Sequence, residues 1–117
     1  GPCACEIFVL IFAFLLTDPG TILLTRGNHE DEQMNMMQAK EGGGFFHECL
    51  EKYNEDIFFK FTEIFKLLPL ACVVHHEVFV VHGGLSGGPP VTLGAIDAIK
   101  HTEVCCPSPD SENPYDR

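Results

Sequence analysis

Hydrophobic residues along the chain fall into runs of two kinds, one with helical spacing and one of short apolar blocks. The longest run, residues 7–16, is apolar at every position and is followed by the helix-stopping sequence Asp18-Pro-Gly20. Glu6 suits the positive end of a helix dipole, and Pro2 suits a first turn. We expect a helix here, and a helix that is apolar on all sides is expected to be buried.

Two further helices are expected over residues 45–52 and 55–68. In the second, apolar residues recur at three- and four-residue spacing, which is typical of a helix that packs on a core. These residues are Phe58, Phe61, Ile64, Phe65 and Leu68. Residues 31–40 are predicted to be irregular or helical, and Gly42-Gly-Gly44 is predicted to interrupt the chain.

Short apolar blocks predict strands over residues 21–25, 71–74 and 78–81. The last two flank a short polar segment and are predicted to form a hairpin, with His75 and His76 at its exposed turn. These two imidazoles are therefore not expected to bind metal.

The first and last of these strands run directly into polar, glycine-containing sequence. One strand leads into Arg26-Gly-Asn-His-Glu30, and the other leads into His82-Gly-Gly-Leu-Ser86. Taken singly, each segment is most often an ordinary turn, because Asn and Gly tolerate turn conformations. Two such strand endings in one chain favour a shared site.

The residue types at these strand ends suit hydrolysis of a phosphate ester. Asn28 can supply an amide oxygen and His82 a ring nitrogen to a metal, and His29 can act as a general acid that protonates a leaving oxygen. Gly27 and the pair Gly83-Gly84 lack Cβ, so backbone can approach the site closely and adopt unusual φ values.

RGNHE and HGGLS, in this order and about fifty residues apart, resemble the phosphoprotein phosphatase family of serine/threonine phosphatases. The resemblance covers residues 5–100 and implies an α/β fold, a partial calcineurin-like metallophosphoesterase domain with helices around a central β-sandwich. Residues 1–104 would form the central part of the catalytic domain and residues 105–117 a divergent, proline-rich, frayed tail. It also implies a short helix within residues 91–99. Met34-Asn35 and Val91-Thr-Leu93 lean toward the branch that carries tetratricopeptide or EF-hand modules.

The resemblance implies metal-dependent hydrolysis of phosphoserine and phosphothreonine in proteins, with two divalent metal ions of the Mn/Fe/Zn class as cofactors. Asn28 and His82 would bind metal, Asn28 would also contact the substrate phosphate, and His29 would be the general acid. Phosphoproteins would be the substrates, and a regulatory subunit or a fused regulatory module would be a partner. The expected location is intracellular, in the cytoplasm or the nucleus.

The sequence also departs from the family. The GDxHG and GDxVDRG motifs, which supply most of the family's metal ligands, do not occur here, and Gly1 resembles the last glycine of the second motif. The family's Trp-Ser-Asp-Pro segment and last metal histidine are missing too, and a role for Arg117 is left open. We therefore expect the isolated chain to have no detectable phosphatase activity and weak, single-metal binding at best. The helix around residues 5–16 would lose part of the sheet that it covers and expose an apolar patch.

Two alternatives remain. The chain could be a catalytically inactive, truncated module that acts in protein binding. It could also belong to a small-molecule or nucleic-acid phosphodiesterase with a similar core, which HGGLS and Leu68-Pro-Leu70 disfavour.

Composition limits the classes of partner that we expect. A formal net charge of −10 argues against a nucleic-acid partner, since such binding depends on basic residues that release counterions. The run at 7–16 is well short of the ~20 residues that span a membrane, so no membrane partner is expected. The six cysteines have neither zinc-module spacing nor a compact disulfide pattern and are expected to be reduced thiols. His47 and His101 are expected at helix surfaces without a role.

Overall fold

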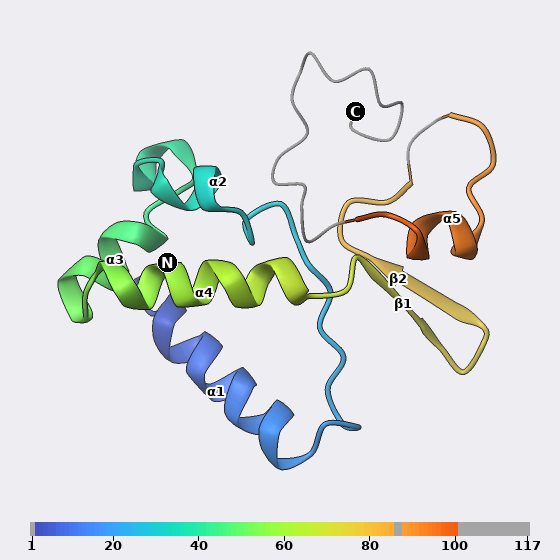
Figure 1. Cartoon of the computed structure of the whole chain (residues 1–117), viewed down its shortest axis with the longest axis horizontal. Coiled ribbons are helices and arrows are strands. Elements are labelled where there is room, and N and C mark those ends of the chain that lie inside the picture. The colour runs from blue at the N-terminus through green and yellow to red at the C-terminus, as the bar shows by residue number, and fades with distance from the viewer. Residues whose placement is uncertain (1, 86–87, 101–117) are drawn as a thin grey trace.

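A computed structural model describes residues 2–85 and 88–100 of the chain. Its elements, in order, are α1 (Ala4–Thr17), α2 (Glu32–Met36), the 3₁₀ turn η1 (Ala39–Glu41), α3 (Phe45–Lys52), α4 (Glu55–Leu67), β1 (Ala71–Val74), β2 (Val78–Val81) and α5 (Leu93–Asp97). Helices α1 to α4 gather at one end of the molecule, and the β1–β2 hairpin lies with α5 at the other (Figure 1). The expectations for Ser86, Cys105, Cys106, His101 and the tail at 105–117 fall outside the described residues. In the described part of the chain, no helix has the length and apolar character needed to cross a membrane.

Glycines separate α2 from α3, as predicted. Gly42 and Gly44 adopt φ values of 97° and 106°, which favour glycine because side chains are strained there. A Cβ on Gly43 would overlap the carbonyl oxygen of Met37, so no side chain fits at this position. The chain therefore turns sharply into α3.

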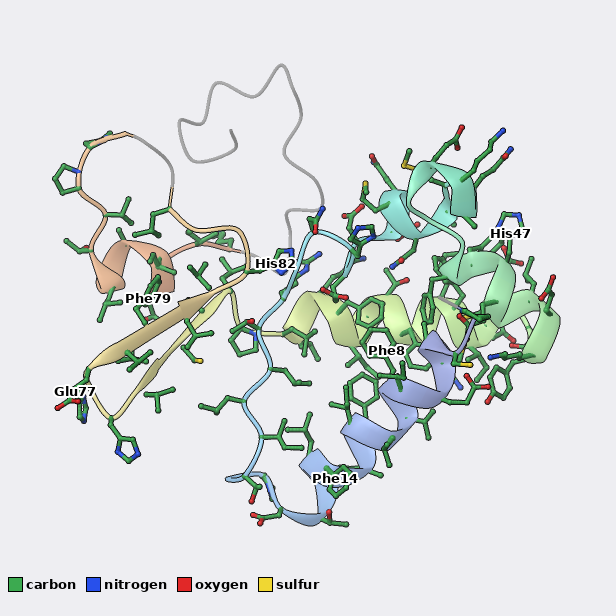
Figure 2. All side chains as sticks on the ribbon, turned by 180° about the vertical axis from the view of Figure 1, so that it is seen from behind. Phe8, Phe14, His47, Glu77, Phe79 and His82 are labelled. Carbon is green, nitrogen blue, oxygen red and sulfur yellow. The ribbon has the colours of Figure 1, made fainter. Side chains whose placement is uncertain are left out.

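Helices α3 and α4 confirm the predicted helices and form the core together with α1. Their buried rings contact each other closely, with centroids 5.2 Å apart for Phe45 and Phe61 and 4.8 Å apart for Phe8 and Phe65. Figure 2 shows Phe8 pointing from α1 into this group. The predicted core stripe on α4 is buried except at Ile64, which is 38 % exposed. The buried residues of the core are Cys5, Phe45, Cys49, Phe58, Phe61, Phe65 and Leu68.

The prediction that the first helix is buried on all sides is wrong for the described residues. Only Cys5 of α1 is buried, because the helix meets α3 and α4 along one side. Its other sides carry large exposed apolar residues, namely Ile7, Val9, Leu10, Phe14 and Leu16, each more than half exposed. The expected apolar patch on this helix is therefore confirmed.

The predicted strand at residues 21–25 is also wrong. The segment has no strand assignment, because within the described residues no strand pairs with it and its backbone forms no ladder. It leads instead to Arg26, whose backbone N–H donates to the carbonyl of Pro69 at 2.7 Å. This bond ties the extended segment to the connection between α4 and β1.

The predicted hairpin is confirmed. Strands β1 and β2 pair antiparallel, with Ala71 opposite Val81 and Val74 opposite Val78, and they form the one sheet of the described residues. His75 and His76 occupy the exposed turn with φ values of 51° and 60°. Two successive positive φ values are those of a type I′ hairpin turn. The short helix expected within residues 91–99 is α5.

Candidate functional site

The loop of residues 26–30 is held in shape by its own backbone and by Glu30. The Glu30 carboxylate accepts the backbone N–H of Gly27 at 2.7 Å, and the Glu30 N–H donates back to the Gly27 carbonyl at 3.3 Å. The Arg26 Nε donates to the Glu30 carbonyl at 2.9 Å. These bonds close the loop into a tight turn that leaves Asn28 and His29 exposed at its tip.

Helix α2 begins immediately after this loop. The buried Asp31 caps it, because one carboxylate oxygen accepts the N–H groups of Gln33 at 2.9 Å and Met34 at 3.1 Å. Such a cap fixes where a helix starts. The position of the loop tip is therefore set on one side by α2 and on the other by the bond from Arg26 to Pro69.

The structure brings together Asn28 and His82, which were predicted from separate motifs. The Oδ1 atom of Asn28 lies 2.9 Å from Nε2 of His82, across 54 positions of sequence. His82 follows β2 directly, and Figure 2 shows it beside the loop that precedes α2. Both side chains are exposed.

The two donor atoms of this pair fit a divalent metal. Ligand atoms that each lie ~2.1 Å from one ion are roughly 3.0–3.4 Å apart in octahedral or tetrahedral geometry. A separation of 2.9 Å is close to that range, and an amide oxygen with an imidazole nitrogen is a suitable donor set. Among the described residues no group of three or more His, Cys, Asp or Glu side chains could hold a metal ion. The described residues thus bring one oxygen donor and one nitrogen donor together at this place.

Gly27 makes the approach of His82 possible. A Cβ on Gly27 would lie 3.1 Å from the His82 ring and 2.7 Å from the Glu30 carboxylate. Gly84 has a φ of 83°, which confirms the unusual φ predicted for the second loop. The close approach predicted at Gly83 and Gly84 is not seen among the described residues, since nothing lies within 4 Å of a Cβ placed there.

The His29 ring faces the glycine turn that precedes α3. It is 3.7 Å from a Cβ placed on Gly42, and it lines an open groove that α1 and α3 also border. Phe8 and Glu48 line the same groove. An exposed imidazole at the edge of a groove can exchange protons with a bound group, which the predicted role of His29 requires.

The other histidines of the described chain lie apart from the pair. Figure 2 places Glu77, next to the turn histidines, at the opposite end of the hairpin from His82. His47 is exposed on α3, as expected.

Glu30 is the residue of this site to which sequence reasoning gave no role. Its signal is the spacing, since a carboxylate three residues after a glycine can accept that glycine's N–H and close a turn.

Comparisons with known proteins agree on the ancestry of the chain. The family model described as calcineurin-like phosphoesterase matches residues 4–116. The chain is similar to serine/threonine-protein phosphatase T of Trypanosoma brucei brucei, with 41 % identity over 86 % of this chain and 20 % of the relative. It is also similar to serine/threonine-protein phosphatase 5 of Arabidopsis thaliana, with 42 % identity over 85 % of this chain and 18 % of the relative.

A solved structure has the same fold. It is a protein serine/threonine phosphatase of Saccharomyces cerevisiae with similarity to human phosphatase PP5, and it matches with a TM-score of 0.83 and 34 % identity. The match covers 95 % of this chain and 33 % of that one. The chain therefore spans about a fifth of the length of these two curated relatives and a third of the solved one. The relatives named T and 5 fit the lean toward the tetratricopeptide-linked branch.

Proposed function

The chain belongs to the calcineurin-like phosphoesterases and, among them, to the serine/threonine protein phosphatases, and on this basis we propose its function. It carries part of the active site that hydrolyses phosphoserine and phosphothreonine in proteins. The observation that carries this proposal is the contact of Asn28 with His82, which joins the two motifs into one donor pair. The substrates are phosphoproteins. A regulatory subunit or a fused regulatory module is the proposed partner.

The donor pair and His29 have different tasks. Asn28 and His82 hold metal through an oxygen and a nitrogen, and the Asn28 amide also contacts the substrate phosphate. Two divalent metal ions, when bound, neutralise the charge of the phosphate and lower the pKa of an attacking water. The remaining ligands come from outside the donor pair.

His29 donates the proton that the leaving group needs. A serine or threonine alkoxide is a poor leaving group, so a positioned acid that protonates this oxygen speeds departure. His29 is adjacent to Asn28 in a loop that Glu30 and the Arg26–Pro69 bond hold in place. The same rigid turn thus presents one residue to the metal and the next to the leaving oxygen.

Metal binding by the 117-residue chain tests the donor pair without requiring activity. We expect titration with Mn²⁺ to broaden the NMR signals of Asn28 and His82 before those of other residues, because the paramagnetic ion acts on nearby nuclei. His82→Ala should weaken this effect at least about tenfold, since it removes a ligand. His76→Ala is the matched control, an imidazole lost from an exposed turn, and should leave the titration unchanged. Broadening that begins at the hairpin turn would overturn the assignment.

The exposed apolar side of α1 favours a second candidate function, a non-catalytic module that binds protein. This candidate predicts that a complete domain carrying these residues fails to turn over a phosphopeptide in the presence of Mn²⁺. Turnover that His29→Asn abolishes would reject it and support the phosphatase.

A further inference from the structure

Two cysteine thiols meet inside the helical end of the molecule. The Sγ atoms of Cys5 in α1 and Cys49 in α3 lie 3.6 Å apart, and both residues are 0 % exposed. Both are free thiols, and 44 positions of sequence separate them. Of the other cysteines of the described residues, Cys3 is exposed and Cys72 is half-buried.

The backbone around this pair is already fixed in a bonded arrangement. Glu48, the residue before Cys49, accepts the backbone N–H of Ala4 at 3.1 Å and that of Cys5 at 2.9 Å. A disulfide needs an S–S distance of about 2.05 Å, so the sulfur atoms must approach by roughly 1.5 Å. Side-chain rotation can supply much of this movement while the Glu48 bonds keep the two helices together.

We propose that Cys5 and Cys49 are an oxidative modification site, at which a peroxide converts the two thiols into a disulfide that fastens α1 to α3. This inference concerns the helical end and does not depend on the proposed phosphatase activity.

In the closed structure both thiols are protected. Burial raises the pKa of Cys5 to about 12, and the contact with Cys49 and the charge of Glu48 add to the effect. Burial also raises the pKa of Cys49. Since the thiolate is the reactive form, oxidation requires a local opening that returns a thiol to water.

Cys5 is the thiol that such an opening exposes first. It lies in the first turn of α1, two positions after the exposed Cys3, whereas Cys49 lies within α3. Helix ends open more readily than helix interiors. When the first turn opens, Cys5 is the thiol that reaches the oxidant, and when it closes, Cys5 returns to Cys49.

The chemistry balances in two steps. The Cys5 thiolate attacks one oxygen of hydrogen peroxide, the O–O bond breaks, and the leaving hydroxide takes a proton to become water, so Cys5 becomes a sulfenic acid. The Cys49 sulfur then attacks the Cys5 sulfur, the S–O bond breaks, and a second water leaves with the Cys49 proton. The two thiols lose two electrons and two protons, and the peroxide is reduced to two waters. A dithiol reverses the change.

The disulfide would act on a helix that meets the core along one side only. Large parts of α1 are exposed, and its contacts with the core lie along one side. A cross-link that closes a loop of this length restricts the unfolded chain, so we expect the thermal midpoint to rise by roughly 5–15 °C.

The experiment treats the reduced 117-residue chain with hydrogen peroxide, alkylates the remaining thiols and maps tryptic peptides by mass spectrometry without reduction. We expect the peptide of residues 1–26 to be linked to that of residues 41–52, and dithiothreitol to release the link. Cys3→Ser should keep this link, because it alters an exposed thiol in the same peptide. Cys5→Ser and Cys49→Ser should each abolish it.

Failure of a variant to fold does not confuse the result, since the wild-type chain and Cys3→Ser already locate the link. The proposal is overturned if Cys3→Ser loses the link. It is also overturned if Cys5 and Cys49 are still alkylated on denaturation after the exposed Cys3 is fully oxidised, or if the linked chain shows no rise in its thermal midpoint.

Discussion

The two ends of the molecule are built on different principles. The helical end of α1, α3 and α4 has a buried aromatic core, with Phe58 and Phe65 at 0 % and 1 % exposure. The hairpin end has no fully buried residue in either strand, and the two motifs of its candidate site meet through the contact between Asn28 and His82. Figure 1 shows the exit of α4 leading into β1, and the extended segment between α1 and α2 passing between the two ends. Stability therefore resides in the helical end, and candidate chemistry resides where the chain is least buried.

This division agrees with a general relation between stability and function. Functional loops need exposed polar groups that bind ligands, and such groups contribute little to a core. Here the loop is tied to the helical end through α2 and the Arg26–Pro69 bond, so the more stable helical end fixes the position of the site.

The largest expected effect comes from breaking the aromatic core. Phe58→Ala removes a ring that is fully buried, and we expect a loss of about 3–5 kcal/mol in the free energy of unfolding. Urea denaturation followed by circular dichroism measures it. Phe59→Ala, which removes a ring that is 39 % exposed from the next position of the same helix, should cost about 1 kcal/mol. Equal losses for the two variants would show that the helical end is not the stable part.

A second effect comes from the buried carboxylate that joins α1 to α3. Burial by itself raises the pKa of Glu48, but hydrogen bonds from the Cys5 and Ala4 backbone and from Lys52 outweigh it, and the pKa lies below its ordinary value. A lowered folded pKa means that the stabilisation is complete above the ordinary glutamate pKa of about 4.3 and is lost as the pH falls through the folded value.

Glu48→Gln should therefore cost about 1–3 kcal/mol at neutral pH and flatten the loss of stability below about pH 4.3. Urea midpoints measured between neutral and acid pH check this. Glu51→Gln removes an exposed carboxylate from the same helix and should change neither quantity. If Glu48→Gln loses as much stability at acid pH as the unaltered chain, the role of this carboxylate is contradicted.

The smallest expected effect concerns the stability of the β1–β2 hairpin. His75 and His76 have positive φ values, which Asn and Gly adopt more readily. The double variant His75→Asn, His76→Gly should stabilise the hairpin by about 0.5–1 kcal/mol. Amide hydrogen exchange of β1 and β2 should slow, while exchange in α4 stays the same. A destabilised hairpin would mean that the turn depends on the imidazoles themselves.

Most of the helical end could be predicted from sequence, because its signals are local. The spacing of phenylalanines in α4 predicted a helix with a core side, and the glycines at 42–44 predicted the break before α3. Glu48 could not be predicted as buried, since its position resembles an exposed helix residue and its backbone partners in α1 lie 43 and 44 positions away.

The two wrong predictions, the strand at residues 21–25 and the burial of the first helix on all sides, have one physical cause. The structure of each segment depends on which elements pack against it. Residues 21–25 have the composition of a strand, but a strand needs a partner for its backbone bonds, and none pairs with it in the described chain. The first helix is apolar on every side, yet only one side meets a neighbour.

For the site, the motifs predicted the residue types, and the structure added that Asn28 and His82 meet. It also added the fixed loop around them, which depends on the hydrogen bond that the Gly27 N–H donates to the Glu30 carboxylate. The roles assigned to Asn28, His29 and His82 stay predictions.

The central claim is that neighbouring residues of one loop have different tasks, with Asn28 and His82 holding metal and His29 donating a proton. It is tested most directly in a complete catalytic domain that carries these residues. Metal content and turnover of a phosphopeptide and an aryl phosphate are measured for His29→Asn and His82→Ala. We expect His29→Asn to keep its metal and lose a factor of roughly 10²–10⁴ in phosphopeptide turnover.

The loss in His29→Asn should shrink with the aryl phosphate, whose leaving group departs without a proton. His82→Ala should lose metal affinity, fall in activity with both substrates and recover in part at high metal concentration. Loss of metal from His29→Asn, or tight retention of metal by His82→Ala, would contradict the account.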